Sequence, residues 1–236
     1  MTAVQMNAEI LRNMSIIAED ERLMNRVAKY LRKLVAEKED PTLLTKEEAC
    51  EQLLLDPTND YMLFFGLVRE YKGLDLLLDA MQLVKDQLPN LRLLIAGEFY
   101  EDERKYREQI KRNGLTERVI VRNEFVPDAD LRKYFGAANL IVQPYKSATQ
   151  SGVTQVAFHF EKPILVTNVG GLGEIVHHGK MGYATDPNAQ DIAQAIADYY
   201  DNQRQVAFTD YLREEKKKYD WNKMTQTIRD IYEQIK

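Results

Sequence analysis

The sequence predicts an α/β fold, a doubly wound parallel sheet of the Rossmann-like kind, preceded by an N-terminal helical hairpin. Short, nearly all-apolar runs alternate with amphipathic segments of helical period from residue 61 onward. Strands that are buried on both faces have this continuous apolar character. The segments are joined by loops of a few residues, which favours right-handed crossovers with helices on both faces of one sheet.

The expected elements follow one another along the chain in strand and helix order. The strands are expected at 61–67, 91–96, 119–121, 140–143, 164–167 and 182–184. The helices are expected at 74–88, 101–113, 128–138, 151–160, 171–178, 191–200, 203–218 and 222–235. Asp128 is a suitable N-cap for its helix, and Trp221 is expected to anchor the last helix by packing.

Residues 5–38 have a different character, because they contain no glycine and no proline. Their apolar positions recur at helical spacing, and Lys and Arg cluster on the opposite face. We expect two amphipathic helices, with Asp20 capping the second and Pro41 ending the region. About 40 residues are too few for a nucleotide-binding domain. The predicted organisation is therefore a helical appendage or fusion segment at 1–43 and a Rossmann-like domain at 44–236.

Composition excludes several classes of protein. The chain has 236 residues, 44% of them hydrophobic, which is enough to bury a core. Its 32 Lys and Arg against 37 Asp and Glu give a net charge of −5, which argues against general nucleic-acid binding. The single cysteine, Cys50, excludes an intramolecular disulfide and fits a reducing compartment. Without a secretion signal or an apolar run of about 20 residues, we expect a cytoplasmic chain with no transmembrane segment, free or peripheral to the inner membrane face.

Ligands of such a sheet bind beyond the carboxyl ends of its strands. The first loop there, 66–73, places Arg69 and Lys72 between Gly66 and Gly73. Arg69 could grip phosphate oxygens with its planar fork, and Lys72 could add a mobile charge. The loop is either a diphosphate clamp or a pair of ordinary surface cations. The other loops at this edge are 97–100, 124–128, 144–151 and 168–173.

The loop after the fourth strand, 144–151, offers hydroxyls and an amide just before a helix. Ser147, Thr149 or Ser151 could simply cap that helix. Gly152 in the first turn costs stability relative to alanine, which makes sense where a ligand approaches the backbone closely. The free N–H groups of this turn are candidates for binding a phosphate or sugar hydroxyls.

The remaining motifs point to no metal and no nucleophile. Gly170, Gly171 and Gly173 could form a tight turn or an anion nest, but they lack the GxGxxG spacing of a dinucleotide site. The adjacent His177 and His178 diverge, and neither they nor His159 have partners at metal-ligand spacing. No GxSxG elbow is present, and Cys50 is not expected to be a nucleophile because it lies in a helical segment ahead of the first strand. No acidic cluster follows the first strand, which excludes a receiver domain.

The ordered motifs together resemble the carboxy-terminal, donor-binding domain of GT-B glycosyltransferases of family 4, also called glycosyl transferases group 1. The resemblance runs from about Thr45 to Lys236. Its segments occur in family order: Phe64-Phe65-Gly66 with Arg69 and Lys72-Gly73, Leu94-Ile95-Ala96-Gly97, Phe125-Val126-Pro127 with Asp130-Leu131, Ala137-Ala138-Asn139-Leu140 to Pro144, Lys162-Pro163-Ile164, and Val169-Gly170-Gly171-Leu172-Gly173-Glu174.

The resemblance implies a retaining transfer of sugar from a nucleoside diphosphate sugar to an unknown sugar or lipid-linked acceptor. Arg69 and Lys72 would act on the diphosphate in place of a metal, so no cofactor is expected. The turn after Pro144 would hold the distal phosphate and sugar, and backbone near Glu98 and Glu124–Val126 would border the base. The implied binding residues are Gly66, Gly97, Glu98, Val126, Thr149, Gln150, Ser151, Gly152, Gln155, Gly170 and Gly171.

Two departures from the family pattern stand out. The family's two glutamates around the helix after Pro144 fall on Ala148 and Val156, leaving Gln150, Ser151 and Gln155 as polar substitutes. The family's amino-terminal acceptor domain is also replaced by a helical segment, so the chain looks truncated or fused and is expected to transfer sugar poorly alone. The alternative is a non-catalytic nucleotide-binding module, or one that oligomerises through residues 5–38.

Overall fold

The computed structural model describes residues 43–216. The expectations for the helices within 5–38, for the cap Asp20, for Trp221 and for the helix 222–235 lie outside the described residues. Within the described part, no helix is both long and apolar enough to cross a bilayer.

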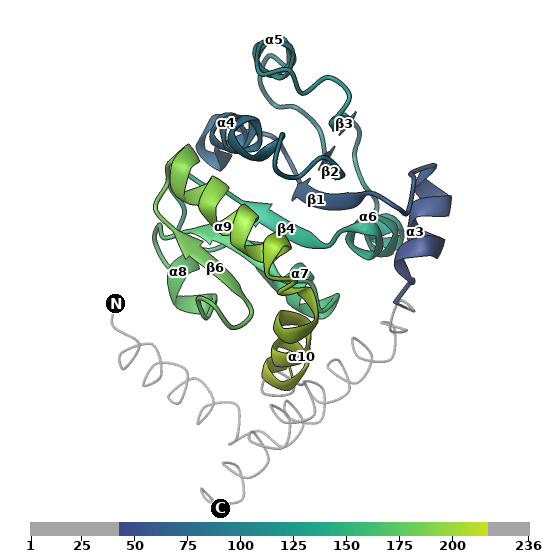
Figure 1. Cartoon of the computed structure of the whole chain (residues 1–236), viewed down its shortest axis with the longest axis vertical. Helices are drawn as coiled ribbons and strands as arrows, with labels where there is room; N and C mark the ends of the chain where they lie inside the picture. The colour runs from purple at the N-terminus through teal and green to yellow at the C-terminus, as the bar shows by residue number, and fades with distance from the viewer. Residues whose placement is uncertain (1–42, 217–236) are drawn as a thin grey trace, which may run out of the picture. The chain divides into compact units, whose positions relative to one another are not determined.

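Six parallel strands form one sheet in the order β3-β2-β1-β4-β5-β6 (Figure 1). This confirms the predicted doubly wound fold, in which the strand order reverses between β1 and β4. Tyr61 of β1 is tied to the start of β4 through the side chain of Asn139, whose Oδ1 accepts the Tyr61 N–H at 2.8 Å. The strands are β1 (Asp60–Phe65), β2 (Leu91–Ala96), β3 (Val119–Arg122), β4 (Leu140–Gln143), β5 (Ile164–Thr167) and β6 (Gly182–Thr185).

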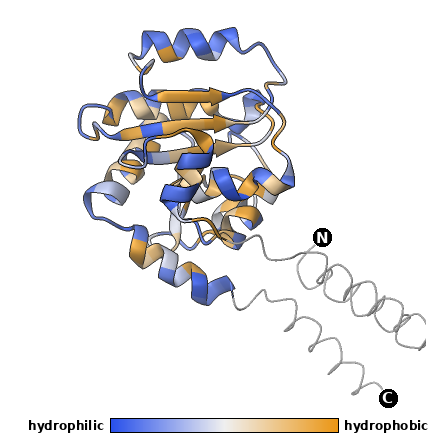
Figure 2. Cartoon of the chain, turned by 90° about the vertical axis from the view of Figure 1, so that its right-hand side faces the viewer, coloured by the Kyte–Doolittle hydropathy of each residue, from blue (hydrophilic) through white to orange (hydrophobic). Residues whose placement is uncertain are grey.

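Two apolar clusters cover the two faces of the sheet. One cluster joins β1, β2 and β4 to α4 (Leu74–Val84), α5 (Arg104–Arg112) and α9 (Ala189–Asp201). The other joins them to α3 (Lys46–Leu53), α6 (Leu131–Ala137), α7 (Gly152–His159) and α8 (Leu172–Ile175). The helix α10 (Gln205–Lys216) contributes Phe208 to the first cluster and Leu212 to the second. The strands are therefore mostly apolar, while helices show a polar outer face (Figure 2).

Local capping explains where the prediction was incomplete. No bounds were predicted for α3, which begins with a capping box: the Thr45 hydroxyl accepts the Glu48 N–H, and the Glu48 carboxylate accepts the Thr45 N–H. The prediction that Asp128 caps a helix over 128–138 was wrong. Asp128 lies inside the 3₁₀ turn η2 (Asp128–Asp130), which Pro127 precedes, and α6 starts only at Leu131.

Close packing of α3 on α6 generates a stability prediction. A Cβ on Gly136 of α6 would stand 2.8 Å from the Ala49 Cβ of α3, whereas a Cβ on Gly152 of α7 would meet nothing within 4 Å. Gly136→Ala should therefore lower the free energy of unfolding by about 1–3 kcal/mol through overpacking. Gly152→Ala, the matched control, should raise it by up to about 1 kcal/mol through helix propensity. Denaturant unfolding measures both, and equal stabilisation by the two substitutions would contradict the packing.

Candidate functional site

The loop after β1 is built around a left-handed glycine. Residues Glu70–Lys72 form the short 3₁₀ turn η1, and Gly73 follows with φ 68°. A Cβ on Gly73 would stand 1.9 Å from the carbonyl oxygen of Pro144, so only glycine fits here. The contact brings the loop after β1 directly against the loop after β4, as the sequence predicts for the two sides of a binding site.

Lys72 is a buried cation without a counter-charge. Its side chain leaves the residue only 8% exposed, and within residues 43–216 it forms no ion pair with a carboxylate. Its Nζ lies 3.1 Å from where a Cβ on Gly66 would stand and 5.8 Å from the centroid of the Tyr145 ring. Burial, with a contribution from the nearby Arg69 charge, lowers the pKa of Lys72 to about 8.

Arg69 lies close enough to Lys72 for its charge to lower the lysine pKa. Its guanidinium carbon stands 4.4 Å from the ring centroid of Tyr100, which belongs to the loop after β2. The Nε atom is buried and has no hydrogen-bond partner in the described structure. A buried donor without an acceptor is unfavourable unless something else accepts from it. The two predicted clamp residues are thus brought together, and both keep donors unused.

The start of α7 faces this loop through Tyr145. The Ser151 hydroxyl accepts the Val153 N–H at 3.3 Å, so Ser151 is the N-cap among the three candidates. The buried Tyr145 hydroxyl lies 3.3 Å from the Ser151 oxygen, and burial raises the pKa of Tyr145 to about 12. The Val153 side chain also approaches Gly66, at 3.9 Å from its Cβ position. Lys72, Tyr145 and the first turn of α7 therefore border one space.

Lys146 joins the same two loops on the outer side. Its N–H donates to the Tyr71 carbonyl at 2.7 Å, and its Nζ pairs with Asp75 at 2.7 Å. Sequence reasoning missed Lys146, Asp75 and the aromatic residues Tyr100 and Tyr145. Both tyrosines lie in loops that follow predicted strands, at 97–100 and 144–151, and this position was the available signal.

The loop after β2 extends the sheet toward the cations. A Cβ on Gly97 would stand 2.3 Å from the Gly66 carbonyl oxygen, so the two loops touch through glycine backbone. The Glu98 carbonyl accepts the Val68 N–H at 2.8 Å, and the Glu98 side chain is exposed. Val126, predicted to border the base, is buried in the second apolar cluster. Its role at a base remains a prediction.

The glycine loop after β5 packs on the loop after β4. A Cβ on Gly170 would stand 1.7 Å from the Ala148 carbonyl oxygen, and the Gly171 N–H donates to the Thr149 carbonyl at 3.0 Å. This packing accounts for both glycines, and ligand binding by either remains a prediction. The polar residues Thr149, Gln150 and Gln155 are exposed, and Val156 of α7 is partly buried in the second cluster.

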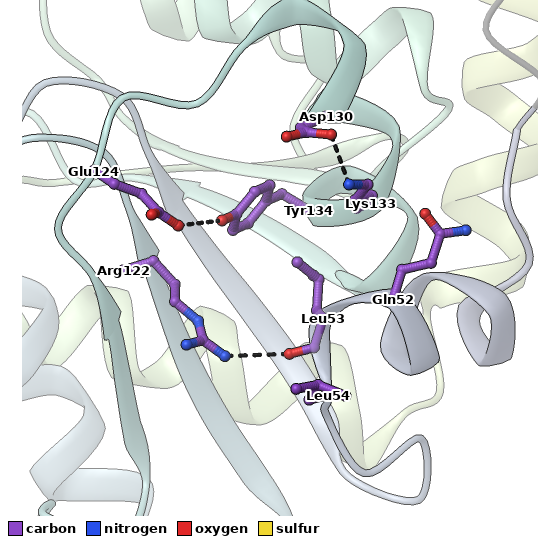
Figure 3. A pocket seen from close by; sticks show the side chains of 8 residues that line it. All are labelled: Gln52, Leu53, Leu54, Arg122, Glu124, Asp130, Lys133 and Tyr134. Carbon is purple, nitrogen blue, oxygen red and sulfur yellow. Dashed lines mark hydrogen bonds and ion pairs between the residues drawn. The ribbon is translucent and has the colours of Figure 1, made fainter.

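A pocket of about 270 Å³ lies between the end of α3, the end of β3 and α6 (Figure 3). Most of its polar side chains are bonded within the pocket: Glu124 accepts from the Tyr134 hydroxyl, Lys133 pairs with Asp130, and Arg122 donates to the Leu53 backbone carbonyl. Neither Arg69 nor Lys72 lines it. This pocket is therefore separate from the two cations after β1.

Four other titratable groups have structural roles. Lys162, whose pKa burial also lowers to about 8, donates to the Gly136 carbonyl at 3.1 Å and so closes the end of α6. His177 contacts the Tyr211 hydroxyl and His178 the Ala184 backbone, which confirms that the adjacent histidines diverge. Cys50 is fully buried in α3, and burial raises the pKa of its thiol, as expected of a packing residue.

The sheet order, with its reversal between β1 and β4, defines a doubly wound α/β domain. The family follows from the sequence: residues 45–219 match Glycosyl transferases group 1, and the chain belongs to this family. An uncharacterized glycosyltransferase of Methanocaldococcus jannaschii is 26% identical over 214 residues, covering 89% of this chain and 58% of its own length. A D-inositol 3-phosphate glycosyltransferase of Pseudarthrobacter chlorophenolicus is 29% identical over 63% of this chain and 36% of its own length.

Solved structures agree on the fold. Sucrose-phosphate synthase from Thermosynechococcus elongatus superposes with a TM-score of 0.67 at 24% identity, over 83% of this chain and 50% of its own. HepE from Anabaena in complex with UDP-glucose superposes with a TM-score of 0.65 at 21% identity, over 78% of this chain and 51% of its own. The C-terminal domain of the group 1 protein LpcC from Francisella tularensis superposes with a TM-score of 0.68 at 15% identity, over 77% of this chain and 98% of its own. The chain thus spans roughly a third to three fifths of the two curated relatives described above.

The buried, unpaired charge of Lys72 predicts that this residue destabilises the free protein. Lowering its pKa from 10.5 to about 8 corresponds to about 3 kcal/mol against the charged folded form. Lys72→Met should therefore raise the free energy of unfolding at pH 7 by about 1–3 kcal/mol, whereas the exposed Lys111→Met should leave it within about 0.5 kcal/mol. Urea unfolding of both variants measures this difference.

The lowered pKa of Lys72 also determines how its effect on the free energy of unfolding depends on pH. Because the folded-state pKa lies below the unfolded one, the unfolded chain binds more protons between about pH 8 and pH 10.5. Through Lys72 the wild-type protein gains stability as the pH rises through that interval, and the advantage of Lys72→Met disappears above it. If Lys72→Met instead lowers the free energy of unfolding at every pH, then Lys72 stabilises the folded protein.

Proposed function

We propose that this chain is the donor-binding half of a retaining glycosyltransferase. It binds a nucleoside diphosphate sugar at the carboxyl edge of the sheet and transfers the sugar to an acceptor, itself a sugar or a lipid-linked sugar. The observation that carries the proposal is the pair Arg69 and Lys72, two adjacent cations with unused donors beside the start of α7. A diphosphate supplies the two linked negative groups that these cations lack.

The chemistry follows from where charge grows in the reaction. When the bond between the sugar and the diphosphate breaks, negative charge develops on the departing nucleoside diphosphate. Cations that are already in place stabilise that charge in the transition state, and they need no reorganisation to do so. In this proposal Arg69 and Lys72 perform the role for which other enzymes use a divalent metal, so the reaction is metal-independent.

Contacts to the sugar and ribose come from amides and hydroxyls. The family's two glutamates are absent here. The nearby polar groups are the exposed Gln150 and Gln155 and the Ser151 hydroxyl. Amides can both donate to and accept from sugar hydroxyls, although they carry no charge. This arrangement makes the donor site neutral on its sugar side and cationic on its phosphate side.

The domain organisation is part of the proposal. Residues 44–236 form the donor domain, and residues 1–43 are a separate segment. The superposition on a C-terminal domain of a group 1 protein, which covers 98% of that domain and 77% of this chain, supports a separate donor domain. We expect the chain alone to bind the donor and to transfer sugar inefficiently, because the matched relatives extend well beyond the aligned part.

Calorimetric titration with UDP, GDP and ADP tests the cation pair. The Arg69→Ala, Lys72→Ala double variant should bind the preferred diphosphate at least about tenfold more weakly, because each charged hydrogen bond contributes about 1.5–3 kcal/mol. The matched control is Lys111→Ala with Arg112→Ala, which removes the same charge from the exposed last turn of α5, at the opposite edge of the sheet. Unchanged affinity in the Arg69 and Lys72 variant, or an equal loss in the control, would refute the clamp.

A further inference from the structure

We propose that Tyr100 is a positioning residue of the diphosphate site, holding the Arg69 guanidinium on its ring face so that the N–H donors stay available for phosphate. This inference rests on the proposed function, because it assigns a role within the same site. Tyr100 itself lies in the loop after β2 and belongs to none of the motifs on which the family resemblance depends.

The geometry is that of a cation–π contact. The guanidinium carbon of Arg69 stands 4.4 Å from the ring centroid of Tyr100, inside the limit of about 6 Å for such contacts. Tyr100 is 69% exposed, so its ring contributes little to the core. Its contact with Arg69 is therefore not a by-product of core packing. Arg69 contributes its charge to this contact, while its Nε remains buried and without an acceptor.

A ring face holds an arginine differently from a carboxylate. A carboxylate accepts from the guanidinium edge and neutralises it, which removes the donors that a phosphate would use. A ring attracts the flat face of the cation and leaves all five N–H groups in the plane. The edge of Arg69 is therefore kept both charged and unoccupied.

Other arginines of the described structure show the contrast. Several use their donors on carboxylates: Arg104 on Asp102, Arg107 on Glu103, Arg204 on Asp198 and Arg213 on Glu161. Others use theirs on backbone carbonyls: Arg92 on Pro89, Arg118 on Leu88 and Arg122 on Leu53. An arginine held by an aromatic ring is thus distinct from these structural pairs.

Hydrogen bonds connect the loop that carries the Tyr100 ring to the loop that carries the Arg69 guanidinium. The Tyr100 N–H donates to the Val68 carbonyl at 3.1 Å, and the Val68 N–H donates to the Glu98 carbonyl at 2.8 Å. The Glu101 carboxylate accepts the Glu70 N–H at 3.0 Å, directly after Arg69. The loops after β1 and β2 therefore continue the parallel pairing of their strands, which places Tyr100 next to Arg69.

A double-mutant cycle on the full chain tests the proposal by calorimetry with UDP and GDP. Tyr100→Phe keeps the ring and should bind within twofold of wild type. Tyr100→Leu should lower the affinity about two- to fivefold, as expected for an exposed cation–π contact. In the Arg69→Gln background, the same Tyr100→Leu change should have no effect, because the cation that the ring holds is gone.

Three results would overturn the role of Tyr100: unchanged affinity in Tyr100→Leu, an equal loss in Tyr100→Phe, or the same loss with and without Arg69. The last result would place the ring directly on the ligand. Failure of the proposed function is distinguishable, because Arg69→Gln would then bind UDP and GDP as tightly as wild type. Circular dichroism of each variant confirms folding, and Tyr100→Met replaces Tyr100→Leu should the leucine variant not fold.

Discussion

Two neighbouring cations with no carboxylate between them are the constraint on which this site depends. Within the described residues, Lys72 is nearly buried without an ion pair and Arg69 keeps a buried donor unused. In the free protein both features are unfavourable, since burial and like charge oppose the ammonium of Lys72. In the proposed function, the attraction of a bound diphosphate for both cations would offset these unfavourable contributions. The pKa of Lys162 is lowered equally, but its Nζ donates to the Gly136 carbonyl and so already has a partner within the protein.

The fold keeps this arrangement in place with backbone contacts. The reversal of strand order between β1 and β4 brings their two loops together, and Gly73 lets them touch at the Pro144 carbonyl. Gly97 allows the loop after β2 to approach Gly66 in the same way. Aromatic rings then stand beside the cations, Tyr100 at Arg69 and Tyr145 at Lys72, where acids would have neutralised them. The scaffold therefore places two cations at the edge where doubly wound sheets bind ligands.

The sequence predicted the sheet well, because buried parallel strands are apolar on both faces and are read without tertiary information. The strands 91–96, 140–143 and 164–167 were predicted with the bounds that the structure has. Helix ends were less predictable, since they depend on side-chain caps: Thr45 caps a helix whose bounds were not predicted, and Asp128 does not cap its own. At the site, residue type and spacing indicated Arg69 and Lys72. The partners Tyr100, Tyr145 and Lys146 come from other loops, and only the folded chain brings them near.

The protonation state of Lys72 tests the central claim most directly. Its Nζ can be observed by NMR in selectively labelled protein, with and without a saturating nucleoside diphosphate. We predict a pKa of about 8 in the free protein and a rise of more than about one pH unit when the diphosphate binds. A lysine that titrates near 10.5 in the free protein, or whose pKa stays the same when the ligand is bound, would contradict it.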